Sequence, residues 1–307
     1  MIALRRMLRA CWVPLAARAA RGYVAGPDLE DALQICRRLS QQGVAGTVCY
    51  WNGDGDSPRA ITDEYLGALA GLARERLNCS LSVKAPPLGF ARDLFAEILE
   101  VARRGGLTVH FDSLAPETCD ATFALIAESR ARHPRLGCTL PGRWRRSIRD
   151  ADLAVDLRLG VRVVKGQWAD PGVPDLDMRA GFLAVIDRLA GRAPQVGVAT
   201  HDPELAREAL RRLRGAGTPC ELEQLLGLPA GPSLREAAAA GVPVRFYVPY
   251  GLAYLPYALS KAMHNPRMVW WVVRDLARGG GALLPNGAPA GGGPVAGRPR
   301  DVRCERL

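Results

Sequence analysis

Eight short apolar runs recur along this 307-residue chain, and amphipathic segments with helical spacing separate them. The runs have the length of strands, and the segments between them are long enough for helices. Strands that alternate with helices pair in parallel through right-handed crossovers. The predicted strands are residues 43–51, 79–84, 107–112, 135–140, 161–165, 196–201, 220–226 and 244–250.

Eight is the number of strands that closes a (β/α)₈ barrel. Helical periodicity is clearest in residues 63–77, 91–106, 117–132, 179–192 and 203–217. The last two segments run into glycine, which suits a helix C-terminus. An open doubly wound sheet is the alternative, but no GxGxxG follows the first strand. The sequence therefore predicts an α/β fold, a TIM-type barrel with parallel strands.

The barrel is predicted to occupy residues 23–278, close to the usual size of such a domain. Residues 279–307 are rich in glycine and proline and contain few apolar side chains that could pack, so they are predicted to be a disordered tail. Residues 1–22 form a basic amphipathic segment with no acidic residue. It has too many arginines for a secretory signal, and its apolar stretches are too short for a membrane span. A helix docked on the barrel, a start-site artefact and a helix resting on an anionic membrane surface all remain open.

The net charge of +10 comes mostly from arginines scattered over the helical segments. No zinc knuckle, basic repeat or aromatic–basic alternation accompanies them, so we expect no nucleic-acid partner. None of the eight cysteines forms a CxxC pair, and several lie inside apolar runs. We therefore expect buried thiols in a reducing, cytoplasmic setting, with no metal site.

Polar residues occur at or near the ends of six of the predicted strands. Barrels of this type carry their chemistry at the carboxyl ends of the strands. Six such residues around one mouth therefore indicate a site. They are Lys84, Asp112, Lys165, His201, Gln224 and Tyr247.

Four motifs resemble proline dehydrogenases. VRVVKGQW resembles the fifth-strand signature RLVKGAYW, VATHD resembles ATHN, ELEQLLG resembles FEFQxLxG, and RFYVPYG resembles RxYxPxG. They follow in the family's order and spacing within residues 23–266, and they are also similar to the proline dehydrogenase domain of the bifunctional proline utilisation protein. The resemblance implies a barrel that holds FAD and takes a hydride from L-proline to give 1-pyrroline-5-carboxylate. It also implies a quinone as electron acceptor, so peripheral contact with the inner membrane stays open. The sequence does not decide between FAD and FMN, nor the oligomeric state.

The resemblance also assigns roles to single residues. On the substrate side lie Lys84, Asp112, Tyr247, Tyr257, Ser260 and Lys261. On the cofactor side lie Arg162, Lys165, Gly166, Gln167, Trp168, Thr200, His201 and Gln224. A cation beside a flavin ring stabilises the anion that forms on reduction.

Each of these roles has a plainer alternative. Arg162 and Lys165 could be stabilising or surface charges, and His201 a loop histidine. Gln224 could be a core amide with its hydrogen bonds satisfied. Lys84 and Asp112 could form an ion pair that stabilises the barrel, and Tyr247 could be packing.

The chain also departs from the family's pattern. Pro141 replaces a glutamine, Gln167 replaces a tyrosine, and residues 51–56 (WNGDGD) stand where LGE is usual. Ser260 and Lys261 occupy the places of an arginine pair that grips the substrate carboxylate. Lysine is a point charge and serine carries none, whereas arginine binds a carboxylate bidentately.

These departures leave three hypotheses. The first is a dehydrogenase acting on proline or a related cyclic or secondary amine. The second is a flavin-binding barrel with weak or no turnover. The third is a membrane-surface module that depends on residues 1–22.

Overall fold

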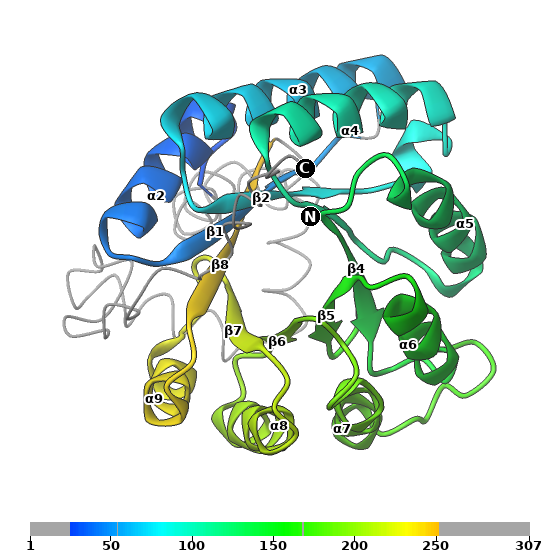
Figure 1. Ribbon diagram of the computed structural model, residues 1–307, viewed down its shortest axis with the longest axis vertical. Helices are drawn as coiled ribbons and strands as arrows, with labels where there is room; N and C mark the ends of the chain where they lie inside the picture. Colours follow the sequence, from blue (N-terminus) through cyan, green and yellow to red (C-terminus); the bar gives the residue numbers. More distant parts are fainter. Residues whose placement is uncertain (1–24, 54, 168, 252–307) are drawn as a thin grey trace, which may run out of the picture.

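Eight parallel strands close into a barrel in chain order, with the last strand paired to the first (Figure 1). This computed structural model describes residues 25–53, 55–167 and 169–251. Each predicted strand overlaps one observed strand, so the predicted TIM-type barrel is confirmed. The strands are β1 (Ala45–Tyr50), β2 (Cys79–Val83), β3 (Val109–Phe111), β4 (Leu136–Pro141), β5 (Gly160–Val164), β6 (Val196–Ala199), β7 (Cys220–Leu225) and β8 (Val244–Tyr250).

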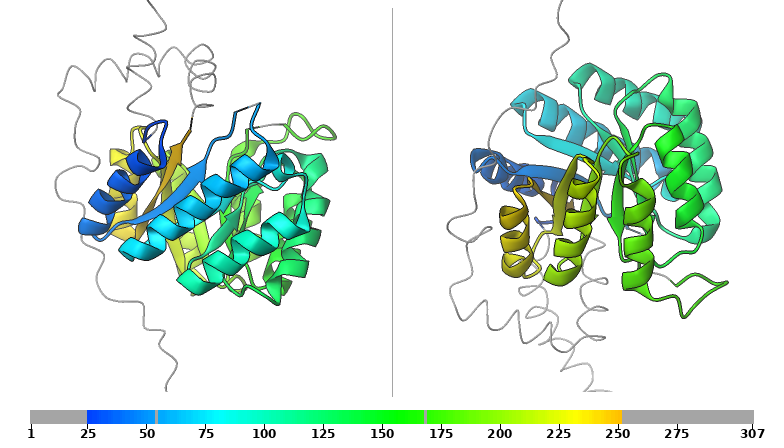
Figure 2. Two further views of the ribbon diagram at one scale, coloured as in Figure 1. Left: turned by 90° about the horizontal axis from the view of Figure 1, so that it is seen from above. Right: turned by 60° about the horizontal axis from the view of Figure 1, so that its bottom comes forward.

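Helices cover the outside of the barrel (Figures 1 and 2). The five segments singled out by periodicity are α3, α4, α5, α7 and α8. Helix α8 begins with two residues that favour a helix start: the Asp202 side chain accepts from the Leu205 amide, and Pro203 is the first helical residue. The helices are α2 (Leu29–Gln41), α3 (Pro58–Glu75), α4 (Arg92–Gly105), α5 (Cys119–Arg130), α6 (Ser147–Asp156), α7 (Met178–Leu189), α8 (Pro203–Gly215) and α9 (Gly231–Ala240).

The main apolar core lies between the strands and the helices. Outward-facing strand residues such as Val48, Leu81 and Val163 are fully buried, as are Leu72 and Ile186 on the helices that face them. Because alternate strand residues point to opposite faces, the other half of each strand faces the bore of the barrel. The apolar layer thus accounts for the burial of only one strand face.

The bore itself is polar, in contrast to the branched apolar residues that usually fill it. Thr47, His110, Arg162 and Glu223 are buried there. Gly197 on β6 makes room for this set, since a Cβ at that position would lie 2.3 Å from Glu223 Oε1. A larger residue at position 197 would therefore displace the buried Glu223 carboxylate.

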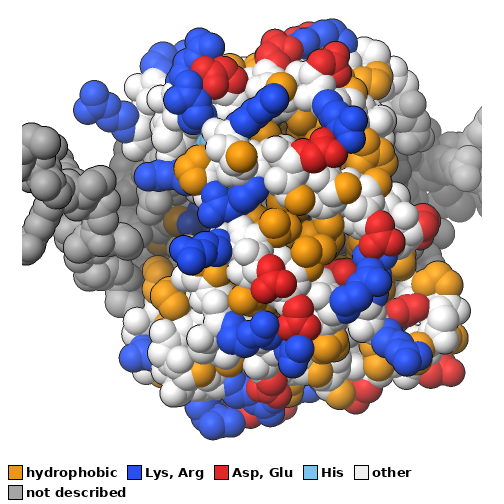
Figure 3. Space-filling view, turned by 45° about the vertical axis from the view of Figure 1, so that its right-hand side comes forward, with side chains coloured by type: hydrophobic (Ala, Val, Ile, Leu, Met, Phe, Trp, Pro, Cys, Tyr) orange, Lys and Arg blue, Asp and Glu red, His pale blue; other side chains and the backbone are white. Residues whose placement is uncertain are grey.

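Arginines on the outer helices pair with acids on the next helix. In the face shown in Figure 3, positive and negative side chains are interspersed. Many of these groups are half exposed, so each pair contributes little stability singly. The pairs between neighbouring helices are Arg37–Glu75, Arg59–Glu97, Arg92–Glu128, Arg146–Asp120, Arg188–Asp152, Arg212–Asp187 and Arg207–Glu236.

Several sequence predictions lie outside the described residues. These are the N-terminal helix 1–22, the tail 279–307, and the site candidates Trp168, Tyr257, Ser260 and Lys261. Within the described ranges, no helix is long and apolar enough to cross a membrane. In the same ranges, no group of three or more His, Cys, Asp or Glu side chains is arranged to hold a metal ion.

Candidate active site at the carboxyl end of the barrel

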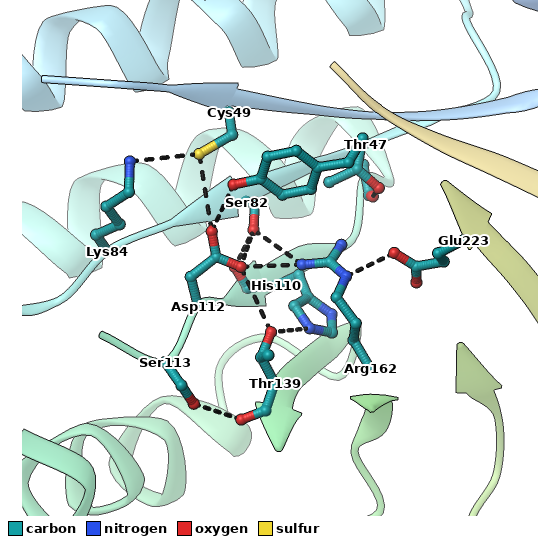
Figure 4. Close-up of polar contacts among 12 residues, drawn as sticks. Thr47, Cys49, Ser82, Lys84, His110, Asp112, Ser113, Thr139, Arg162 and Glu223 are labelled. Atoms are coloured by element: carbon teal, nitrogen blue, oxygen red, sulfur yellow. Dashed lines mark hydrogen bonds and ion pairs between the residues drawn. The ribbon is translucent and has the colours of Figure 1, made fainter. Parts of the chain in front are cut away.

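Asp112 follows β3 at the carboxyl end of the barrel and collects donors from three other strands (Figure 4). Its Oδ1 accepts from Ser82 Oγ at 2.8 Å and from Arg162 Nη1 at 2.9 Å. Its Oδ2 accepts from the Tyr247 hydroxyl at 2.7 Å. Strands far apart in sequence therefore converge on one carboxylate.

Arg162 on β5 links Asp112 to a second carboxylate, that of Glu223 on β7. Its Nε donates to Glu223 Oε2 at 2.5 Å, and its side chain is only 5% exposed. Burial lowers the pKa of Arg162, but the charges of Glu223 and Asp112 outweigh this and raise it. Burial raises the pKa of Glu223, and Arg162 opposes that effect. One permanent cation thus holds two carboxylates inside the barrel.

Tyr247 on β8 packs its ring against Arg162, whose guanidinium carbon lies 5.1 Å from the ring centroid. This is within the range of a cation–π contact. Burial raises the pKa of Tyr247 well above its usual value. The phenol therefore stays protonated at neutral pH and serves as a donor to Asp112.

Lys84 follows β2 beside this cluster but does not pair with Asp112. Its Nζ donates to the Tyr50 carbonyl at 2.8 Å and lies 3.6 Å from Cys49 Sγ. Cys49 in turn lies 3.8 Å from Asp112 Oδ2, so the thiol stands between the two charges (Figure 4). Among the described residues, Lys84 forms no ion pair with a carboxylate. Its charge is therefore available to an anionic group at the barrel mouth.

Lys165 and Arg162 take different directions because β5 ends between them. Arg162 lies within the strand and faces the bore, whereas Lys165 follows Val164, the last strand residue. Lys165 Nζ lies 3.4 Å from Asp202 Oδ2, and its side chain is 38% exposed. Because β5 ends at Val164, Lys165 lies at the mouth of the barrel and does not share the bore with Arg162.

The loops after β4 and β5 lie side by side on this end. Gly166 has a left-handed φ of +94°, and a Cβ there would lie 2.9 Å from Pro141 Cβ. The Gln167 carbonyl accepts from Arg143 Nη1 at 3.1 Å. Arg143 Nε is buried and has no hydrogen-bond partner among the described residues. The loops after β1 and β5 both rise on the same side of the barrel (Figure 2, left).

Thr200 and His201 follow β6 and brace neighbouring loops. Thr200 Oγ1 accepts from the Asp202 amide at 3.2 Å. His201 Nε2 accepts from the Leu225 amide at 3.0 Å, so its hydrogen is on Nδ1, which lies 3.1 Å from the Pro229 carbonyl. Burial lowers the pKa of His201, which favours this neutral form. Both ring nitrogens are occupied within the protein.

The sequence is similar to those of several proline dehydrogenases. The chain is 24% identical over 279 residues to proline dehydrogenase 1 of Bacillus subtilis, covering 84% of this chain and 91% of the relative. It is 26% identical over 283 residues to proline dehydrogenase of Deinococcus radiodurans, covering 85% and 90%. The resemblance to proline dehydrogenases is confirmed. No protein-family model matches the sequence.

Solved structures of proline utilisation A share the fold. The chain superposes on the protein from Bdellovibrio bacteriovorus inactivated by N-propargylglycine with a TM-score of 0.70 and 15% identity, covering 80% of this chain. A structure of proline utilisation A with proline bound in remote sites gives a TM-score of 0.63 and 17% identity, covering 78% of this chain. The chain spans 32% and 30% of those two longer proteins.

Gln224 lies on the outer face of β7 in this proline dehydrogenase-like barrel. Its amide nitrogen donates to the Thr200 carbonyl at 2.7 Å, and its oxygen accepts from Ser233 Oγ at 3.0 Å. It is 1% exposed. This arrangement agrees with the alternative of a satisfied core amide, and a contact with a cofactor remains a prediction.

Sequence reasoning missed Glu223, Cys49 and Ser82, which complete the cluster around Asp112 and Arg162. A signal for Glu223 was present, because Glu221 and Glu223 alternate within a strand and so share one face. Cys49 and Ser82 carry no comparable signal, since small residues of this kind are common in buried strands.

His110 on β3 predicts acid sensitivity. Burial lowers its pKa well below 6.5, and the charges of Arg162 and Arg245 add to this effect. The folded state therefore favours the neutral imidazole. The protein keeps its full stability above the unfolded pKa of about 6.5. As pH falls below that value, the free energy of unfolding falls, because the unfolded chain binds a proton that the folded chain does not. As pH is lowered from 7.5 to 5.5, we expect the free energy of unfolding to fall less steeply in His110→Gln than in the unchanged chain. In urea titrations the difference in slope should approach about 1.4 kcal/mol per pH unit; equal slopes would contradict this assignment.

Proposed function

We propose that this chain is a flavin-dependent dehydrogenase that oxidises L-proline or a closely related cyclic or secondary amine. The main support for this proposal is the arrangement of Asp112. Tyr247 and Arg162 hold this carboxylate at the carboxyl end of a closed barrel, and Lys84 lies beside it. The relatives that carry the name proline dehydrogenase match over most of their length. The proposed product from proline is 1-pyrroline-5-carboxylate, and the proposed electron acceptor is a membrane quinone.

Lys84 is proposed to bind the substrate carboxylate, since it has no carboxylate partner among the described residues. Asp112 would accept a hydrogen bond from the substrate amine and hold it in place. Tyr247 fixes the orientation of Asp112 by donating to Oδ2. The opposite charges of Lys84 and Asp112 would suit the carboxylate and the amine of an amino acid.

FAD is the proposed cofactor, and the loops after β4 and β5 carry cationic side chains that would suit its anionic phosphates. Arg143 has a buried Nε without a partner in the described part of the chain, and Lys165 is held only by a 3.4 Å contact. Gly166 lets these loops approach closely, because a Cβ there would lie 2.9 Å from Pro141 Cβ and 3.1 Å from Arg143 Cβ. Arg143, Lys165 and the Gly166 backbone would hold the cofactor, whose chemistry when bound is acceptance of a hydride.

A flavin-binding protein with slow turnover is the second candidate, and Pro141 favours it. Pro141 is the last residue of β4, where the family has a glutamine that touches the flavin. Proline has no side-chain donor, and its carbonyl already accepts from Ser147 Oγ at 2.6 Å. One contact to the cofactor is therefore replaced or absent.

An absorbance spectrum of the purified full chain, followed by anaerobic addition of cyclic amines, separates these functions. We expect flavin absorption and its bleaching by L-proline or by a near relative such as a hydroxylated or N-methylated proline. A flavin spectrum that no amine bleaches would favour the second candidate. A colourless protein that takes up neither FAD nor FMN would refute both.

Changing Ser260 and Lys261 together to arginine is expected to raise kcat/KM for L-proline. The pair would restore bidentate carboxylate binding, in which one charge-assisted hydrogen bond contributes about 1.5–3 kcal/mol, or roughly a ten- to hundredfold change. Steady-state turnover with an artificial electron acceptor measures this effect. Lys261→Arg alone serves as the matched control. No gain in the double variant would show that the pocket differs from the family at other positions.

A further inference from the structure

Cys36 and Cys79 bring their thiols together at the end of the barrel opposite the candidate site. Cys36 lies on the buried face of α2, and Cys79 is the first residue of β2. Gly46 on β1 pairs with Cys79 and leaves the space that both sulfurs fill. A Cβ at Gly46 would lie 2.7 Å from Cys79 Sγ and 3.4 Å from Cys36 Sγ. Both sulfurs therefore border the space beside Gly46 Cα.

Cys79 faces a polar cavity, whereas Cys36 does not. The cavity has a volume of about 280 Å³ and opens at the amino-terminal end of the barrel, where it is lined by Asn78, Arg135 and Gln195 just before their strands. Cys79 is 8% exposed and lines this cavity, and Cys36 is fully buried behind it. A small solute in the cavity therefore meets Cys79 first.

The two thiols have opposite tendencies to ionise. A hydrogen bond from Cys36 lowers the pKa of the Cys79 thiol against the effect of burial, and the charge of Arg245 lowers it further. The same hydrogen bond and burial raise the pKa of Cys36. Arg245 is fixed nearby because it donates to Glu221 Oε1 at 2.7 Å and to the Gly46 carbonyl at 2.8 Å. Cys79 is thus the nucleophile of the pair, and Cys36 is its protonated neighbour.

We propose that Cys79 and Cys36 are a redox-modification site that forms a disulfide when hydrogen peroxide enters this cavity. The Cys79 thiolate attacks one peroxide oxygen, the O–O bond breaks, and hydroxide leaves, so that Cys79 becomes a sulfenic acid. Cys36 sulfur then attacks Cys79 sulfur, the S–O bond breaks, and the Cys36 proton leaves with the hydroxyl group as water. Two thiols are oxidised, and one peroxide is reduced to two waters.

The disulfide would tie α2 to β2 across β1, and an added thiol would reverse it by exchange. This site does not depend on flavin or on amine oxidation, because the two reacting thiols lie outside the Asp112 cluster, although Arg162 and Glu223 also line the cavity. Among the described cysteines, Cys138 offers a matched control, since it is also buried in a strand. Burial raises the pKa of the Cys138 thiol well above its usual value, so Cys138 should resist peroxide.

The test treats the full chain with hydrogen peroxide, blocks remaining thiols in denaturant, and maps non-reduced peptides by mass spectrometry. We expect a Cys36–Cys79 cross-linked peptide that disappears after reduction. We also expect Cys79 to be oxidised at least about tenfold faster than Cys138, since a thiolate reacts and a thiol does not. Cys138→Ser should leave the cross-link unchanged, and Cys79→Ser should abolish it.

Cys36→Ser provides a second readout in case the cross-link is hard to detect. Without Cys36, the sulfenic acid on Cys79 should persist and be trapped by dimedone added with the denaturant. Circular dichroism would confirm that this variant is folded. The proposal is refuted if Cys79 is oxidised no faster than Cys138, or if folded Cys36→Ser yields no more trapped Cys79 than the unmodified chain does.

Discussion

Asp112→Asn is expected to lower kcat/KM for L-proline by about ten- to a hundredfold while the flavin stays bound. The substitution keeps the shape of the side chain but removes the charge, and a charge-assisted hydrogen bond contributes about 1.5–3 kcal/mol. It also places an amide NH₂ against the donors Tyr247, Arg162 or Ser82. Steady-state kinetics with an artificial acceptor measure the loss, and the flavin absorbance of the variant shows that the cofactor is retained.

Asp152→Asn is the matched control for that experiment. Asp152 lies on the outer helix α6 and pairs with Arg188 and Arg192, not with a residue of the Asp112 cluster. We expect its kcat/KM to equal that of the unchanged chain. If Asp112→Asn also turns over normally, Asp112 does not contact the substrate.

Arg162→Met is expected to destabilise the fold by about 3–5 kcal/mol, because it leaves buried carboxylates without their cation. Asp112 and Glu223 would both lose that partner inside the barrel. Urea unfolding followed by circular dichroism measures the change. The free energy of unfolding should fall while the midpoint shifts to lower urea.

Adding Glu223→Gln to Arg162→Met should recover part of this loss, since the second uncompensated charge is then neutral. Arg188→Met, which breaks an exposed pair with Asp152, should change the free energy of unfolding by less than about 1 kcal/mol. A loss below that level in Arg162→Met would show that the bore tolerates unpaired carboxylates, contrary to the role given to Arg162.

The barrel was predictable because most strands are largely apolar runs, and segments with helical periodicity separate them. Even β3, only three residues long, lies within the predicted segment 107–112. Convergence of Lys84, Asp112 and Tyr247 also follows from strand order, since their strands β2, β3 and β8 lie close around one barrel. In a parallel barrel the carboxyl ends of all strands share one rim.

Side-chain direction was harder to predict. Gln224 and Glu223 are neighbours, yet one faces α9 and the other faces the bore, because a shift of one residue changes the face of a strand. The link from Asp112 through Arg162 to Glu223 joins β3, β5 and β7, which are not adjacent. Contacts across the bore leave no mark in the spacing of residues. The orientation of the His201 ring also could not be predicted, because it depends on a contact with the Pro229 carbonyl in a loop.

Anaerobic mixing with L-proline, in the unchanged chain and in Asp112→Asn side by side, tests the central claim most directly. The absorbance of bound flavin is followed in a single turnover, without an electron acceptor. The account predicts that the unchanged chain loses its flavin absorption and that Asp112→Asn loses it much more slowly. It is contradicted if the flavin stays oxidised with L-proline and every related cyclic amine, or if both proteins bleach at the same rate.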